Sequence, residues 1–155
     1  MIPGSITRLV LRPTRTGVFQ GVCAEYCGAS HALMQFPVVV TDREEFYRWL
    51  EQQSEPAKPM IEGIATQGQT LFIANGCASC HMIRGTDAKG IIGPDLTHVG
   101  SRLSLAGGIL PNEPDAFVRW VAHTDSVKPE AYMPPFGMLS SDELRALATY
   151  LKSLE

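Results

Sequence analysis

Short apolar and β-branched runs alternate with polar residues at the start of the chain, which is the pattern of β-strands. Residues 5–22, "SITRLVLRPTRTGVFQGV", predict two strands joined by a turn at residues 14–17, because proline and glycine interrupt the apolar runs. Another strand is predicted over "QFPVVV", with Pro37 at its start or on a sheet edge. The beginning of the chain is therefore expected to be all-β.

The pattern changes to a helical period in "TDREEFYRWLEQQ", where Thr41 and Glu44 have the spacing of a capping box. Three apolar residues share one face of this helix: Phe46, Trp49 and Leu50. Residues 54–62 follow with two prolines, small residues and no periodicity, and are predicted to be a linker. The chain is thus divided into an all-β part with a trailing helix over residues 1–53, the linker, and a second domain over residues 63–155.

The second domain is predicted to be all-α. Its first helix, "ATQGQTLFIANG", stops at Gly76, and its second, "PDAFVRWVAH", begins at Pro114, which suits the first turn of a helix. The last, "SSDELRALATYLKSLE", opens with Ser140 and Glu143 as a capping box. Its apolar stripe consists of Leu144, Leu147, Ala148 and Leu151. Long glycine- and proline-containing loops separate these helices and are expected to wrap something other than a protein core.

Charge and hydropathy exclude several classes of protein. The 155 residues carry a net charge of −3, and residues 62–155 have seven basic and ten acidic side chains. Without a basic patch, nucleic acid is not an expected partner. The apolar runs are too short to span a bilayer, and the first residues lack the features of a signal peptide.

The segment Cys77-Ala-Ser-Cys80-His81 has the spacing by which haem c is attached. Two thiols add to the haem vinyl groups, and the next imidazole lies under the iron as its proximal ligand. The alternatives are a redox dithiol and half of a zinc site. A redox dithiol would need a βαβ context, and a zinc site would need a second pair nearby, whereas Cys23 and Cys27 lie in the other half. We therefore predict one covalent haem c.

A sixth iron ligand is expected, because a methionine paired with a histidine raises the potential of an electron-transfer haem. Four methionines are candidates: Met60, Met82, Met133 and Met138. Met82 is adjacent to the proximal histidine and cannot reach the opposite face, and Met60 lies in the linker. Met133 precedes two prolines that stiffen its loop, which lowers the entropy cost of ordering it over the iron, so we prefer it to Met138. Either could instead be a core methionine. The remaining histidines, His98 and His123, are expected to be structural or exposed.

Four features of the second domain resemble a class I cytochrome c: "CASCH", "GPDL", "MPP" and the terminal helix. The resemblance covers residues 62–154 and implies several helices around one haem. It also implies that an early glycine and aromatic, Gly68 and Phe72, pack against Tyr150 of the last helix.

The resemblance further concerns two residues beside the haem. A ligating histidine usually donates its second ring N–H to a carbonyl, and Pro94 is implied as the partner of His81. Arg102 is implied as a contact of a haem propionate.

A second cluster of soft ligands lies in "CAEYCGASHALM", where Cys23, Cys27, His31 and Met34 fall within twelve residues. A disulfide, a partial zinc site and free thiols are the alternatives, but zinc rarely uses a thioether. Two thiolates, an imidazole and a weak methionine are copper ligands, and they lie on a loop between predicted strands. Two thiolates can also bridge two copper ions.

This segment resembles the binuclear copper (CuA) loop of cytochrome c oxidase subunit II, and the likeness extends over residues 3–53. Nitrous oxide reductase shares the ligand spacing, but "AEYCG" favours the oxidase. The resemblance implies that Cys23 and Cys27 bridge the coppers and that His31 and Met34 complete one of them. Glu25 is implied to offer its carbonyl to the other copper and its side chain to a magnesium ion at a subunit interface.

Together the two halves resemble subunit II of a caa-type oxidase, with a partial, Greek-key cupredoxin-like segment followed by an all-α cytochrome c domain. The family has a further copper-ligating histidine and a membrane hairpin upstream, so CuA is expected to be incomplete in this chain, which we interpret as a fragment, a split gene product or a mis-assigned start.

The function implied is electron transfer from a donor protein or a quinol-oxidising complex, through haem c and CuA, to catalytic subunit I. The chain would act in the periplasm or on the outer face of the bacterial cytoplasmic membrane, held there by the complex or by an upstream segment. The alternatives are a soluble periplasmic cytochrome c whose copper domain no longer functions, and a redox switch made of Cys23 and Cys27.

Overall fold

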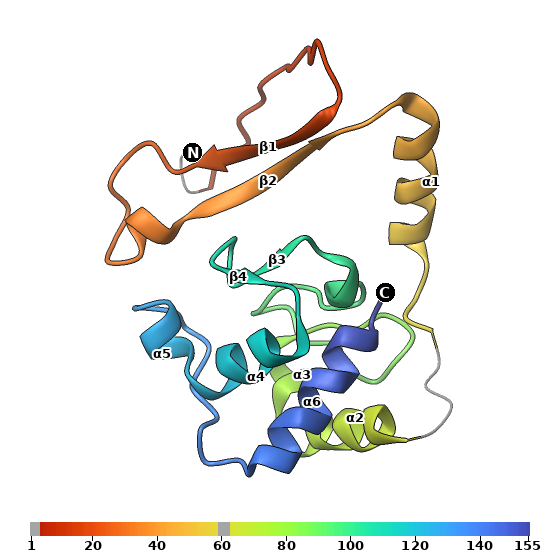
Figure 1. Cartoon of the computed structure of the whole chain (residues 1–155), viewed down its shortest axis with the longest axis vertical. Helices are drawn as coiled ribbons and strands as arrows, with labels where there is room; N and C mark the ends of the chain where they lie inside the picture. The colour runs from red at the N-terminus through yellow and green to blue at the C-terminus, as the bar shows by residue number, and fades with distance from the viewer. Residues whose placement is uncertain (1–3, 59–62) are drawn as a thin grey trace.

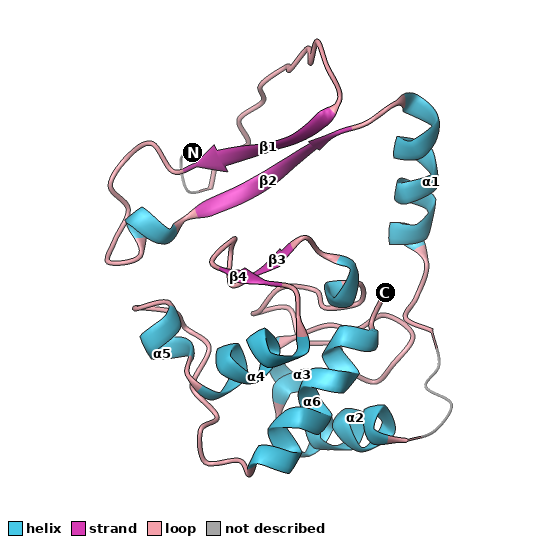
Figure 2. Cartoon of the chain, viewed as in Figure 1, coloured by secondary structure: helices cyan, strands magenta, loops and turns pink. Residues whose placement is uncertain are grey.

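The computed structural model describes residues 4–58 and 63–155, so part of the predicted linker and the candidate Met60 lie outside the described residues. An antiparallel hairpin and one helix form the N-terminal part, and a helical unit follows (Figures 1 and 2). In the hairpin, β1 (Gly17–Val22) pairs with β2 (Gln35–Val40) in a register that runs from Gly17 opposite Val40 to Val22 opposite Gln35. A short 3-10 helix, η1 (His31–Leu33), lies in the long loop that joins the two strands.

The predicted first strand within residues 5–22 is wrong, because β1 is the only strand of that range. A strand needs a neighbour to satisfy its backbone hydrogen bonds. Among the described residues, none pairs with the apolar run at residues 9–11, which is exposed. Both faces of the β1–β2 sheet also leave apolar side chains exposed, including Val18, Val22, Phe36 and Val39. The predicted cupredoxin-like segment is therefore present only as this small two-stranded sheet.

Helix α1 (Arg43–Ser54) begins one residue later than predicted. Its N-cap is Asp42, whose carboxylate accepts a hydrogen bond from the backbone N–H of Glu45 at 2.9 Å. The predicted capping box of Thr41 and Glu44 is therefore wrong. Aspartate is a strong N-cap residue, and the Thr41 hydroxyl instead contacts the Glu45 carboxylate. The apolar face of α1 remains about half exposed, with Trp49 at 51%.

The second domain consists mainly of helices and loops, as predicted (Figure 2). Its elements are α2 (Ile64–Ala74), α3 (Cys77–Cys80), η2 (Val99–Ser101), β3 (Ser104–Leu105), β4 (Leu110–Pro111), α4 (Pro114–Ala122), α5 (Thr124–Val127) and α6 (Ser141–Ser153). The capping box at the start of α6 is confirmed, since the Ser140 and Glu143 side chains each bond to the other's backbone N–H. Across the two described ranges, no helix combines the length and the apolar composition that crossing a membrane requires.

The core of this domain is built where α2 crosses α6. A Cβ atom on Gly68 would lie 2.1 Å from the carbonyl oxygen of Ala146 and 2.6 Å from Cβ of Tyr150, so only glycine permits this approach. Beside the crossing, the rings of Phe72 and Tyr150 meet edge to face with centroids 5.8 Å apart. Burial raises the pKa of Tyr150 to about 12, so its phenol stays neutral in this core. The packing of Gly68 and Phe72 on Tyr150, expected from the resemblance, is confirmed.

We expect Gly68→Ala to destabilise the protein even though alanine favours helices. The gain in helix propensity is about 1 kcal/mol. Separating two packed helices to accommodate a methyl group costs about 1–3 kcal/mol or more. Thermal unfolding of the haem-loaded protein, followed by circular dichroism, should show a lower midpoint. The control is Gln67→Ala, on an exposed position of the same helix. Equal midpoints for the two variants would contradict the tight crossing.

Candidate metal and haem sites

The loop between β1 and β2 brings five soft or polar donor groups together. The Sγ atoms of Cys23 and Cys27 are 3.5 Å apart, which is too far for a disulfide and close enough for a shared ion. Cys27 Sγ lies 3.7 Å from His31 Nδ1 and 3.7 Å from Met34 Sδ. Cys23 Sγ lies 3.2 Å from the carbonyl oxygen of Glu25. All the copper ligands predicted from the sequence therefore converge on one small volume.

Local backbone structure holds this loop closed. The Cys23 N–H donates to the Met34 carbonyl at 3.0 Å, which joins the first and last ligands directly across the base of the loop. Gly28 has φ of +128°, a conformation that side chains with a Cβ rarely adopt, and its carbonyl accepts from the His31 N–H at 3.0 Å. The turn at Gly28 therefore brings the imidazole back toward the two thiols.

The chemistry of this donor set fits copper. The ligand atoms of Cys23, Cys27 and His31 all lie within 4.8 Å of one another. Thiolate, imidazole and thioether donors are the combination that copper selects over harder cations. The hydrogen bond with Cys23 raises the pKa of the Cys27 thiol, so this thiol is protonated near neutral pH when no metal is bound. Metal binding therefore has to displace the proton of Cys27.

The second site begins at Gly76, a left-handed residue with φ of +74° that ends α2 and starts α3. The single turn of α3 places Cys77 and Cys80 in succession, and the His81 N–H closes the turn by donating to the Cys77 carbonyl at 3.0 Å. Burial raises the pKa of the Cys77 thiol. Both cysteines are free thiols, as thioether attachment to a haem requires.

The loop over residues 90–94 fixes the imidazole of His81. His81 Nδ1 lies 2.8 Å from the Pro94 carbonyl oxygen. This contact orients the ring and leaves Nε2 available to bind a metal. A Cβ on Gly93 would lie 2.4 Å from His81 Cε1, so the glycine allows the loop to lie against the ring. The Gly93 N–H also donates to the Cys80 carbonyl at 2.7 Å. In the sequence, the signal for this loop is the Gly93–Pro94 pair of "GPDL".

The two candidate sixth ligands lie in different surroundings. Met133 is partly buried and packs against the hydrophobic core, and its carbonyl accepts a hydrogen bond from the buried Thr124 hydroxyl at 2.9 Å. Met138 is 77% exposed. The pinned backbone of Met133 makes it the better preorganised of the two. Sequence reasoning had not identified Thr124, a small polar residue that only the fold places beside this loop.

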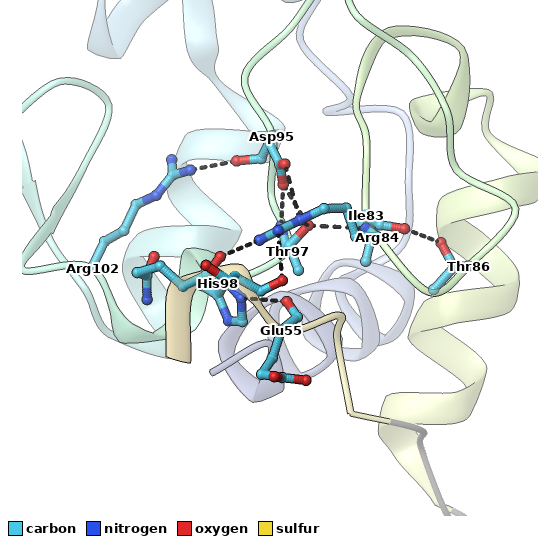
Figure 3. A network of polar contacts seen from close by, with 10 residues as sticks. Glu55, Ile83, Arg84, Thr86, Asp95, Thr97, His98 and Arg102 are labelled. Carbon is cyan, nitrogen blue, oxygen red and sulfur yellow. Dashed lines mark hydrogen bonds and ion pairs between the residues drawn. The ribbon is translucent and has the colours of Figure 1, made fainter. Parts of the chain in front are cut away.

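A polar network around Asp95, the residue after Pro94, connects the two parts of the chain (Figure 3). Thr97 is 1% exposed and donates its N–H to Asp95 at 2.8 Å, while its hydroxyl accepts the N–H of Arg84 at 2.9 Å. The Arg84 guanidinium lies 3.6 Å from Asp95. The Arg102 guanidinium donates to the Asp95 carbonyl, so it lies at the edge of the same loop. Its predicted role as a propionate contact stays a prediction.

The same network holds the end of α1. Arg84 donates to the carbonyls of Gln53 at 2.6 Å and Ser54 at 3.1 Å, and a cation at the C-terminal end of a helix is favourable. His98 Nε2 donates to the Glu55 carbonyl at 2.9 Å (Figure 3). His98 therefore has a structural contact here.

Comparison with known proteins identifies both halves. A model of the family described as "Cytochrome c" matches residues 65–155, and a model described as "Cytochrome C oxidase subunit II, periplasmic domain" matches residues 1–42. The chain is 36% identical over 154 residues to cytochrome c oxidase subunit 2 of Alkalihalophilus pseudofirmus. The aligned residues make up 99% of this chain and 44% of that protein. It is 35% identical over 144 residues to the subunit 2 of Bacillus sp. strain PS3, covering 90% of this chain and 40% of that protein.

A further relative is the alternative cytochrome c oxidase subunit 2 of Bradyrhizobium diazoefficiens, 47% identical over 53 residues, which cover 34% of this chain and 19% of that protein. The chain spans less than half the length of each of these three relatives. The resemblance predicted from the two ligand clusters is confirmed.

We expect the Asp95 network to make stability depend on pH. Partial burial raises the pKa of Asp95, but hydrogen bonds from Thr97 and the charges of Arg84 and Arg102 outweigh it, so the pKa lies below its usual range. A lowered folded pKa adds stability that is present above the unfolded value of about 4 and is lost as pH falls through the folded value. Asp95→Asn should therefore be less stable than the unaltered protein at pH 7, and the gap should close in acid.

Denaturant unfolding of the haem-loaded protein between neutral and acidic pH measures this gap. The matched control is Asp87→Asn, an exposed aspartate of a neighbouring loop. A gap that does not change with pH would contradict the role given to the Asp95 charge.

Proposed function

Because the chain belongs to the cytochrome c family over residues 65–155 and matches the periplasmic domain of cytochrome c oxidase subunit II over residues 1–42, we propose that it receives electrons for a haem–copper terminal oxidase. Electrons would pass from a donor through haem c to the binuclear CuA centre and on to catalytic subunit I. One observation carries the proposal: a haem attachment segment and a converging set of copper ligands occur in the same chain. When bound, haem c and copper supply one-electron redox chemistry, and oxygen is reduced in another subunit.

The loop between β1 and β2 would supply the copper ligands. Cys23 and Cys27 would bridge the two coppers, and His31 with Met34 would complete one of them. Glu25 would contribute its carbonyl to the other copper and its carboxylate to magnesium at a subunit interface. The convergence of His31, Met34 and the Glu25 carbonyl on the thiol pair supports metal binding over a redox switch, which needs only the two sulfurs.

The helical unit would bind and orient the haem. Cys77 and Cys80 would form the thioether bonds, and His81 and Met133 would be the axial ligands. The Pro94 carbonyl holds the imidazole at a fixed orientation, which supports a ligand that need not reorganise. Arg102 would neutralise a propionate at the rim.

The description of the matched family supports a proposal for the place of action. The matched subunit II domain is described as periplasmic, and we propose the periplasm or the outer face of the bacterial cytoplasmic membrane for this chain. Association with the membrane would occur through the complex or through an upstream segment. Its partners would be catalytic subunit I and an electron donor, either a protein or a quinol-oxidising complex.

We expect Met133→Ala to lower the haem potential by on the order of 0.1 V or more, within the roughly 0.8 V that axial ligation spans in haem proteins. The cause is the loss of the thioether that favours reduced iron. The matched variant is Met138→Ala, which removes an exposed methionine of the same loop region and should leave the potential unchanged. Spectroelectrochemical titration measures both. A drop in Met138→Ala alone would reverse the assignment.

We expect Cys27→Ser to abolish copper uptake and leave haem attachment intact, because serine oxygen is a poor substitute for a bridging thiolate. Copper and iron are measured by elemental analysis of the full-length protein, with an electron paramagnetic resonance spectrum. About two coppers per haem, with one unpaired electron shared between them, would show that the site forms in this chain although CuA is expected to be incomplete in it. Tyr26→Phe, a non-ligand in the same loop, is the control. Full copper occupancy in Cys27→Ser would refute the CuA assignment, and a copper-free unaltered protein would favour a cytochrome carrier.

A further inference from the structure

The copper loop and the helical unit touch at two places that flank the ligands His31 and Met34. One lies directly before His31, and the other directly after Met34. In Figure 1 the end of the hairpin that carries η1 lies toward α5 and the β3–β4 turn. The loop that holds the copper ligands is thus the part of the hairpin that docks on the cytochrome unit.

The first contact joins the copper loop to the turn after α5. The Ala29 N–H donates to the Glu130 carboxylate at 2.9 Å, and the Ser30 hydroxyl donates to the Pro129 carbonyl at 2.6 Å. Ser30 is 8% exposed, although its neighbours in the loop are largely open to solvent. Gly28 makes room for this contact, because a Cβ there would lie 3.2 Å from the Glu130 carboxylate.

The second contact joins the start of β2 to the β3–β4 turn. The Gln35 side-chain amide donates to the Gly108 carbonyl at 2.7 Å, and the Gln35 N–H donates to the Gly107 carbonyl at 3.4 Å. A Cβ on Gly108 would lie 2.5 Å from Gln35 Cγ, and Gly108 has φ of +92°. The turn therefore has the one residue type that permits this approach.

The cytochrome side of the first contact leads directly to the candidate axial ligand. Glu130 has φ of +63°, which is uncommon for a residue with a Cβ and persists where surrounding contacts hold it. Three residues further on, Met133 is pinned through its carbonyl by Thr124. One short, held segment therefore connects the contact at Ala29 and Ser30 with the methionine expected at the iron.

We propose that Ser30, Gln35 and Glu130 are positioning residues that seat the copper loop on the axial-methionine side of the cytochrome unit and so fix the separation of the two redox centres. This inference rests on the proposed function. Electron tunnelling slows steeply with distance, and a docked loop keeps the centres at one separation. Both contacts are made by side chains between the cytochrome unit and residues 28–35. A carrier protein that acted separately from the copper loop would not need such contacts.

The test uses the complete haem- and copper-loaded protein and two variants of it. One carries Glu130→Ala, and the other carries Ser30→Ala together with Gln35→Ala. Hydrogen exchange at Ala29 and Gln35, followed by mass spectrometry, reports docking directly. Electron transfer from haem to copper after photoreduction, with the potentials of both centres, reports its consequence. We expect exchange to become at least about tenfold faster in these variants. We also expect electron transfer to slow several-fold at unchanged potentials.

Two matched variants separate docking from charge and folding. Glu130→Gln keeps an acceptor oxygen for the Ala29 N–H and should restore both rates. Glu51→Ala removes an equal charge from exposed α1 and should change neither. Unchanged exchange in Glu130→Ala, or faster exchange with an unchanged electron-transfer rate, would overturn the proposal. Absence of haem-to-copper transfer in the unaltered protein would instead overturn the proposed function, and exchange would still decide the docking.

Discussion

The contact between Gly68 and the backbone of α6 is the constraint on which the haem side of the chain depends. It sets the distance between the two helices of the core, and only Asn75 and Gly76 separate α2 from α3. The orientation of α2 therefore determines where the two attachment cysteines and the imidazole of His81 lie. Gly93 and Pro94, which contact this imidazole, are arranged around a position fixed by that crossing.

The two candidate sites are stabilised in different ways. The copper ligands come from one loop of twelve residues whose ends are joined by a hydrogen bond from Cys23 to Met34, so their convergence is local. The predicted haem ligands come from separate loops, and the Met133 loop is held by packing, by Thr124 and by the Phe136 N–H, which donates to the Val121 carbonyl at 2.9 Å. The exposed apolar faces of the β1–β2 sheet show that the ligand loop is formed by short-range contacts, independently of a filled core on that side.

Short-range patterns predicted short-range structure well. The capping box at Ser140, the buried stripe of α6 and both ligand clusters depend on spacing within one segment, and spacing is visible in a sequence. At Thr41 two competing cap residues stand side by side, and spacing alone did not decide between them. The strand expected near residue 9 failed because pairing depends on a partner elsewhere. The contacts of Glu130 with Ala29, 101 residues apart, and of Arg84 with α1 join segments whose proximity only the fold reveals.

Under the proposed function, the hold of Arg84 and His98 on residues 53–55 also bears on competition between electron donors. These contacts hold the end of α1 on the cytochrome unit and so confine that unit to a small volume around the copper loop. The effective concentration of the cytochrome unit there reaches the millimolar range, on the order of that for a short linker. A docking surface whose dissociation constant lies well below that concentration is then occupied almost all the time. A diffusing carrier at micromolar concentration would be displaced from that surface by mass action alone.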